Sequence, residues 1–132
     1  MSNPGRKILY LSDTYEGSIH DKKICDEEPF DFEHEIELLQ DLGFLGHTPK
    51  NATVQMPVKQ SKYKKLTEEE KQENKMKSSR RVIVEHAISG IKRCRIVKDK
   101  FRYRRYGYDD LVMELACGLH NFRVENRKPI ET

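Results

Sequence analysis

The stretch LTEEEKQENKMKSSRRVIVEHAISGIKRCRIV, residues 66–97, decides the fold because it carries the strongest helix pattern in the chain. Thr67 is followed three residues later by Glu70, which is the spacing of a capping box at a helix N-terminus. Consecutive glutamates fill the first turn, where negative charge suits the helix dipole. The pattern predicts a long helix that begins beside Thr67.

This predicted helix changes character along its length. Residues 68–79 are polar, and they could form a separate helix or an extension over solvent. Residues 80–96 place apolar side chains on one face at about 100° per residue, which predicts the core face of an amphipathic helix. These side chains are Ile83, Val84, Ala87, Ile88, Ile91 and Cys94.

Three short apolar stretches predict strands: residues 7–12, 36–40 and 52–58. The second of them runs directly into Asp41. With helices elsewhere in the chain, these two or three short strands make an α/β unit the predicted fold.

Two further helices are predicted. Residues 18–28 form a short one, with Ser18 as its N-cap and Ile24 facing inward. Residues 108–126 form the last one, whose apolar side chains recur at helical spacing and are expected in the core: Leu111, Leu115, Leu119 and Phe122.

Charge is unevenly distributed. Residues 59–105 hold seventeen Lys or Arg against six Asp or Glu, whereas residues 1–58 hold five against eleven. A surplus of eleven positive charges in the middle block indicates a polyanionic partner, and nucleic acid is the first choice. Between positions 92 and 105 the aromatic side chains Phe101 and Tyr103 lie among eight Lys or Arg, with Tyr106 just beyond. They could stack on exposed bases or pack against the last helix.

Other classes of protein fit poorly. The three cysteines are widely spaced, without a Cys-x-x-Cys pair, which argues against a zinc site or a disulfide framework. Only 36% of the residues are apolar, and no apolar run is long enough to span a bilayer. We therefore expect a soluble cytoplasmic protein with reduced thiols and no membrane partner.

Two acidic residues are candidates for metal chemistry. Asp41 alone would be an Asp-x-Gly turn, and Glu85 alone, with Arg81 and Lys92 beside it, would be a solvated helix face. A carboxylate at a strand end and another on a helix, flanked by cations, are also what metal-dependent nucleic-acid chemistry requires. Such oxygen ligands select Mg²⁺ or Mn²⁺. His20 and His86 are expected to be structural, outside the catalytic set.

Several stretches of the sequence resemble the DDE-class insertion-sequence transposases, of the DDE superfamily endonuclease type. The similar stretches are KILYLSDTYEGSIHDKKICDEE, LLQDLGFLG, VEHAISGIKRCRIVKDKFR and YDDLVMELACGLHNFR. The signature of that family is a Tyr, two residues, an Arg, three residues, the catalytic Glu, six residues and a Lys. Here Arg81, Glu85 and Lys92 match it, and Ser78 stands in place of the Tyr.

The resemblance implies a role for particular residues. Asp41 and Glu85 correspond to the second and third catalytic acids, and both would be ligands of a divalent Mg²⁺ or Mn²⁺ ion. DNA, as transposon ends and target, is the implied partner. Residues expected to bind it are Arg81, Lys92, Arg93, Arg95, Lys98, Lys100 and Arg102.

The resemblance also implies an incomplete enzyme. The first catalytic Asp of the family lies on a strand that precedes the segment similar to residues 7–12. We therefore expect residues 1–126 to be the C-terminal part of a catalytic domain, truncated at the N-terminus, with 127–132 as a flexible tail. The fold would be an incomplete ribonuclease-H-like α/β unit with short strands, a long helix and a C-terminal helix.

Whether such a chain is an enzyme by itself stays open. Its parent activity would be metal-dependent DNA cleavage and strand transfer in transposition, and we expect little of it without the first Asp. An upstream fragment could supply that residue in trans. The alternative is a non-catalytic basic DNA-binding remnant, or a regulator of a full-length transposase.

Overall fold

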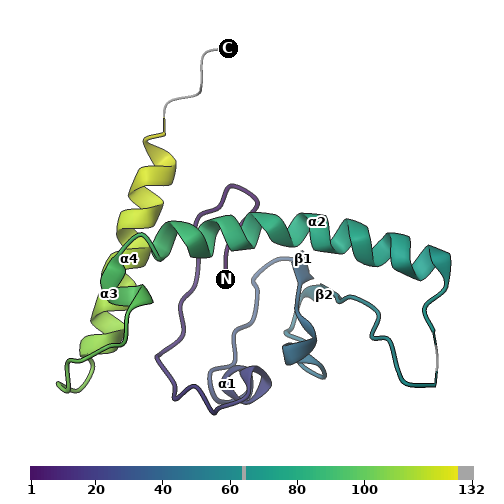
Figure 1. The fold of residues 1–132 in the computed structure, drawn as a ribbon, viewed down its shortest axis with the longest axis horizontal. Coiled ribbons are helices and arrows are strands. Elements are labelled where there is room, and N and C mark those ends of the chain that lie inside the picture. The colour runs from purple at the N-terminus through teal and green to yellow at the C-terminus, as the bar shows by residue number, and fades with distance from the viewer. Residues whose placement is uncertain (64, 128–132) are drawn as a thin grey trace. The chain divides into compact units, whose positions relative to one another are not determined.

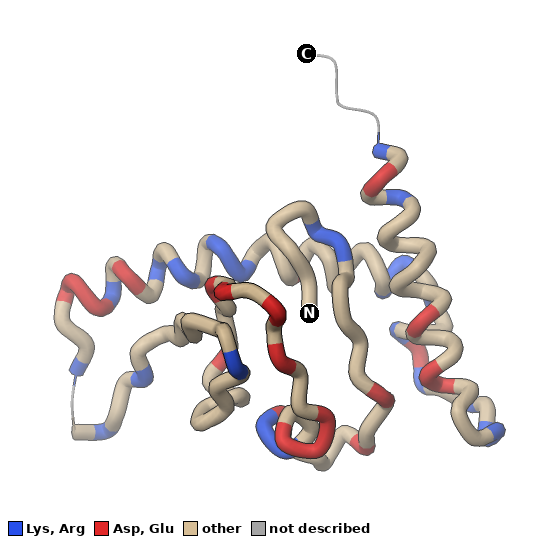
Figure 2. The backbone as a smooth tube through the Cα atoms, turned by 180° about the vertical axis from the view of Figure 1, so that it is seen from behind, with Lys and Arg blue, Asp and Glu red and all other residues tan. Residues whose placement is uncertain are grey.

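The long helix predicted from residue 68 onward is present as α2 (Glu68–Ile91), 24 residues without a break (Figure 1). The structure, a computed structural model, describes residues 1–63 and 65–127. The capping box is confirmed, because the Thr67 amide donates to Glu70 Oε2 at 2.9 Å and the Glu70 amide donates to Thr67 Oγ1 at 3.2 Å. The polar half is thus a continuation of the apolar half, and its first turn is acidic (Figure 2).

The chain divides into two compact units. One comprises Met1–Thr14 with Val82–Thr132, and the other comprises Tyr15–Arg81. The boundary falls inside α2, between Arg81 and Val82.

In the unit Tyr15–Arg81, two strands form a parallel pair, β1 (Ile36–Leu39) and β2 (Ala52–Gln55), with Ile36 opposite Ala52. Together with the helices they confirm an α/β class. The predicted strand 52–58 is too long. Beyond Gln55, side chains of α2 form the hydrogen bonds to backbone groups that a neighbouring strand would otherwise form. The Asn74 carboxamide accepts from the Val58 amide at 2.8 Å and donates to the Val58 carbonyl at 3.0 Å.

Helix α1 (Asp21–Glu27) also belongs to this unit, and it begins later than predicted. Ser18 is not its N-cap. The cap is His20, whose Nδ1 accepts from the amide of Lys22 at 3.3 Å. Ile24 is half-buried.

In the other unit, the last turns of α2 meet α3 (Arg95–Lys98) and α4 (Tyr108–Glu125). The core is small and consists of Ile91, Ala116 and Cys117, with Ile8, Cys94 and Val97 packed against it. On α2 the predicted apolar stripe is only partly buried: Ala87 and Ile91 are inside, whereas Val84 and Ile88 remain 40% and 44% exposed.

Helix α4 has the predicted bounds within one residue, but its predicted core face is wrong. The helix turns its small residues inward, because Ala116 and Cys117 allow a close approach of backbones that Leu side chains would prevent. The large side chains of α4 therefore lie on the opposite face, between 46% and 63% exposed. They are Leu111, Leu115, Leu119 and Phe122.

The predicted strand 7–12 is also wrong. Only an isolated bridge joins Ile8 to Ser2. The Asn121 side chain replaces a neighbouring strand: its Oδ1 accepts from the Ile8 amide at 2.7 Å, and its Nδ2 donates to the Ile8 carbonyl at 2.8 Å. A side-chain amide offers the same donor and acceptor as a peptide group, so this segment satisfies its backbone without a sheet.

The predicted tail, residues 127–132, lies outside the described residues except for Arg127. Among the helices that the structure describes, none combines the length and the apolarity needed to cross a membrane.

Candidate functional site

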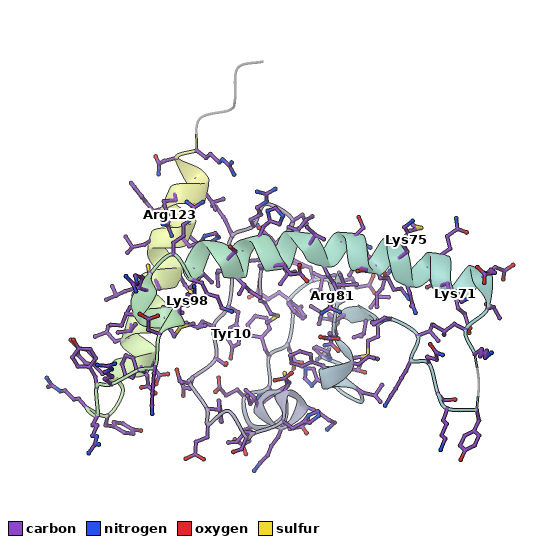
Figure 3. All side chains as sticks on the ribbon, viewed as in Figure 1. Tyr10, Lys71, Lys75, Arg81, Lys98 and Arg123 are labelled. Atoms are coloured by element: carbon purple, nitrogen blue, oxygen red, sulfur yellow. The ribbon has the colours of Figure 1, made fainter. Side chains whose placement is uncertain are left out.

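Asp41 follows β1 and serves the turn there. Its Oδ1 accepts from the Leu42 amide at 2.7 Å, which caps a 3₁₀ helix, Leu42–Phe44. The same carboxylate also holds Arg81, whose Nη2 lies 3.0 Å from Asp41 Oδ2 and whose Nη1 lies 3.4 Å from Oδ1. Arg81 belongs to α2, where Figure 3 labels it. Asp41 therefore both caps the turn and forms an ion pair with Arg81.

The preceding residue of α2 makes a second ion pair. Arg80 Nη1 and Nη2 donate to the two oxygens of Glu37 on β1, at 2.8 and 3.2 Å. The hydrogen bonds from Arg80, and then its charge, hold the pKa of Glu37 below its ordinary value of 4.5, and the same pair raises the pKa of Arg80. Two adjacent arginines thus tie the helix to the sheet of its own unit.

Glu85 lies in the other unit, where it lines a cleft of about 500 Å³. Four arginines from three separate segments also line the cleft: Arg6, Arg93, Arg123 and Arg127. The remaining lining residues are His86, Ser89, Gly90, His120 and Val124. One carboxylate among four guanidinium groups leaves a strong positive excess, which suits a ligand with several negative charges.

A buried histidine builds this cleft. His120 is 5% exposed, and its Nε2 donates to the carbonyl oxygen of Arg6 at 2.7 Å. Arg6 has a φ of 66°, a left-handed conformation that residues other than glycine seldom adopt, and the amide of Arg6 donates to Asn3 O at 2.9 Å. The N-terminal segment is therefore held in one conformation that brings Arg6 to the cleft.

The same histidine packs against the end of α2. A Cβ at Gly90 would overlap the imidazole ring of His120, so only glycine fits. The carbonyl of Gly90 accepts from Arg123 Nη2 at 2.9 Å (Arg123 is labelled on α4 in Figure 3). In a continuing helix that carbonyl would accept from the amide of Cys94, which instead donates to Ile91 O at 3.0 Å.

The basic residues between 92 and 105 therefore do not continue the helix of Glu85, although the sequence predicts a helix as far as residue 96. Helix α2 ends at Ile91, and the run passes through a turn and then α3. Arg93 joins the cleft, and Arg95 lies 3.7 Å from Asp99. Six of the predicted DNA-binding residues are exposed: Lys92, Arg93, Arg95, Lys98, Lys100 and Arg102. Arg81 differs, because it is engaged by Asp41.

Asp41 and Glu85 belong to different units, and each is exposed. Within residues 1–63 and 65–127 there is no group of three or more His, Cys, Asp or Glu side chains placed to hold a metal ion. The donor chemistry of the two carboxylates nevertheless suits a hard divalent cation.

Sequence reasoning missed the arginines at both ends of the chain. Arg6 and Arg123 are separated by more than a hundred residues, and their segments are brought together by His120, which pairs with Arg6, and by Asn121, which pairs with Ile8. A signal was present in Gly90, which interrupts an otherwise good helix, because such a glycine often marks the close approach of another element.

Comparison with known proteins identifies the class. The chain matches the DDE superfamily endonucleases over residues 1–121, and it belongs to that family. This confirms the family resemblance predicted from the sequence.

Among curated proteins, the chain is similar to one described as a probable transposase for insertion sequence element IS702, from Microchaete diplosiphon. The two are 29% identical over 110 residues. The match covers 82% of this chain but only 39% of that relative, so the chain spans well under half of its length. No solved structure matches.

Proposed function

We propose that this chain is a DNA-processing part of an insertion-sequence transposase, with a ribonuclease-H-like architecture. The observation that carries the proposal is the cleft at Glu85. The four arginines around Glu85 can hold a phosphodiester backbone next to this carboxylate. A guanidinium group suits this role because it binds two phosphate oxygens at once. Family membership supports the same function.

In this proposal Asp41 and Glu85 are catalytic and hold a divalent ion, Mg²⁺ or Mn²⁺. Such an ion, when bound, would activate a water or hydroxyl nucleophile and stabilise the leaving oxygen of a phosphodiester. The protein side chains provide the oxygen donors, and the arginines of the cleft keep the DNA strand at Glu85. The exposed cations Lys92, Arg95 and Lys98 extend the contact along the strand (Figure 3 labels Lys98).

The ion pair of Asp41 supports a second candidate function. A guanidinium group at 3.0 Å already neutralises this carboxylate, so a cation must compete with Arg81. We therefore propose that the 132-residue chain alone binds DNA without cutting it, and that it acts together with a full-length transposase or a fragment of one. A chain that occupies DNA ends without cutting would also act as a regulator.

The experiment is a nicking assay on supercoiled plasmid with the purified chain and Mn²⁺, together with duplex binding at increasing salt. We expect salt-sensitive binding and no nicked circles. Nicking that disappears in both Asp41→Ala and Glu85→Ala would instead make the chain an active nuclease by itself. The matched control is Glu37→Ala, which removes a neighbouring acid that is also held by an α2 arginine.

The regulatory role has its own test. Co-expression of the chain should lower the transposition frequency of a related full-length element, and Arg6→Gln combined with Arg127→Gln should restore it. Failure of the wild-type chain to bind duplex DNA at low salt would refute both roles.

A further inference from the structure

The segment between α3 and α4 ends in a turn that projects an aromatic ring into solvent. Tyr106 is fully exposed, and it stands directly after Arg104 and Arg105. A fully exposed tyrosine ring loses the stabilisation that aromatic residues normally gain by burying their apolar surface. The turn therefore offers one flat apolar surface next to two cations.

The base of this turn is well supported. Phe101 packs on Tyr103 with ring centroids 5.7 Å apart, and Tyr103 packs on Tyr108 at 5.3 Å. Gly107 has a φ of 70° and leads into α4, and the amide of Tyr108 donates to Arg105 O at 3.2 Å. Phe101 and Tyr103, with Tyr108 at the start of α4, thus fix the backbone of this segment, and its third aromatic residue, Tyr106, takes no part in their packing.

The turn is also strongly basic. Residues 100–107 contain Lys100, Arg102, Arg104 and Arg105 and no acidic side chain. In the part of the chain that the structure describes, Arg104 and Arg105 make no ion pair with a carboxylate. Asp99 faces Arg95 instead, at 3.7 Å, and Asp110 Oδ1 accepts from the Thr14 amide at 2.6 Å. The guanidinium groups beside Tyr106 are therefore available to an external anion.

We propose that the Arg104–Tyr106 turn is a binding site for single-stranded DNA, in which Tyr106 stacks on an unpaired base and Arg104 and Arg105 contact the adjacent phosphates. Stacking on an exposed aromatic ring with cations along the backbone is the general mode by which proteins hold single strands. A duplex does not satisfy the site, because its base faces are covered by neighbouring bases. The site is independent of the cleft at Glu85 and does not require that the chain process DNA.

The chain contains no tryptophan, so a single substitution provides a specific probe. Tyr106→Trp places one indole at the proposed stacking position. Titration with an oligothymidylate should quench its fluorescence, whereas a blunt duplex of equal length should quench it much less. Tyr63→Trp is the matched control, because Tyr63 is 94% exposed and also lies in a lysine-rich segment but has no proposed contact.

Affinity gives a second measurement. Tyr106→Ala should weaken oligothymidylate binding roughly 5- to 150-fold, the range expected when one base stack is removed, and leave duplex binding within about twofold. Tyr106→Phe should retain the wild-type affinity, because the ring and not the hydroxyl makes the contact. Arg104→Gln should lower the salt slope for single strands by about 0.7, which Tyr106→Ala should not do.

Either of two results would overturn the proposal. One is equal quenching of Tyr106→Trp and Tyr63→Trp by the oligothymidylate. The other is an unchanged single-strand affinity of Tyr106→Ala. A chain that binds duplex DNA but not single strands would refute this site alone and leave the function proposed for the cleft intact.

Discussion

The guanidinium group of Arg81 lies 3.0 Å from the carboxylate of Asp41, and Arg81 precedes Glu85 by four residues on the same helix. The sequence signature of the family contains this arginine, and we expected it to contact DNA. In the structure it contacts the acid at the end of β1 instead. The Arg81 guanidinium cannot bind Asp41 and a phosphate with the same donors at the same time. The competition between these two partners can be measured.

Removal of Arg81 should strengthen divalent cation binding. In Arg81→Gln the Asp41 carboxylate loses its positive partner, so we expect a lower Kd for Mn²⁺, measured by titration of free Mn²⁺ with electron paramagnetic resonance. Asp41→Asn should raise the Kd. The fold should change little, by about 1 kcal/mol or less, because both side chains are at least 40% exposed.

Arg80→Gln is the control for that prediction. It removes the adjacent arginine of α2 and its pair with Glu37, and it leaves Asp41 untouched. Equal Mn²⁺ affinities of the two arginine variants would contradict a specific competition at Asp41.

Two glycines should respond to alanine in opposite directions. Gly90→Ala places a methyl group against the His120 ring, and we expect a loss of about 1–3 kcal/mol in the free energy of unfolding, as for overpacked cores. Gly118→Ala lies on α4 with open space around it, and alanine should stabilise that helix by up to about 1 kcal/mol. Urea denaturation followed by circular dichroism measures both, and a loss in both variants would refute the packing argument.

The cleft arginines should control the salt dependence of duplex binding. Removal of one cation that neutralises a phosphate of B-DNA lowers the slope of log K against log salt by about 0.9. Arg6→Gln and Arg127→Gln should each produce this change. Lys71→Gln should not, because Lys71 lies 2.6 Å from Glu68 at the far end of α2 and outside the cleft. Fluorescence anisotropy at several salt concentrations gives the slopes.

The Arg80–Glu37 pair should impose a pH dependence at acid pH. The folded state lowers the pKa of Glu37. The ion pair therefore stabilises the folded state at pH values above 4.5, the ordinary pKa, and this stabilisation is lost as the pH falls through the lowered pKa. Carboxyl ¹³C NMR should place the Glu37 midpoint below 4.5, and Arg80→Gln should return it upward. An unchanged midpoint in that variant would show that Arg80 is not the cause.

Local signals in the sequence predicted those elements that depend on neighbouring residues. The capping box at Thr67 located the start of α2, and the bounds of β1 and α4 followed from periodicity, because caps and short apolar runs act over a few residues. The α/β class followed from the presence of short strands together with helices.

The predictions that were wrong concerned segments whose structure depends on residues far away in the sequence. The segment at Ile8 reads as a strand, yet Asn121 satisfies its backbone. The Leu side chains of α4 were predicted to be core, yet Ala116 and Cys117 are the α4 residues that pack in the core with Ile91 of α2. Periodicity locates an apolar face of a helix, but it does not reveal when small residues on another face form the packed contact instead. The same reasoning explains why Arg6 and Arg123 were not recognised as parts of the cleft.

The burial of Cys117 has a practical consequence. Its thiol is 6% exposed in the core beside Ile91, and desolvation raises its pKa above 9.0, so little reactive thiolate exists at neutral pH. Cys25 and Cys94 are only half-buried. An alkylating reagent should therefore modify Cys117 last, at a rate set by how often α4 separates from α2, and mass spectrometry of the labelled peptide would time that opening without any engineered probe.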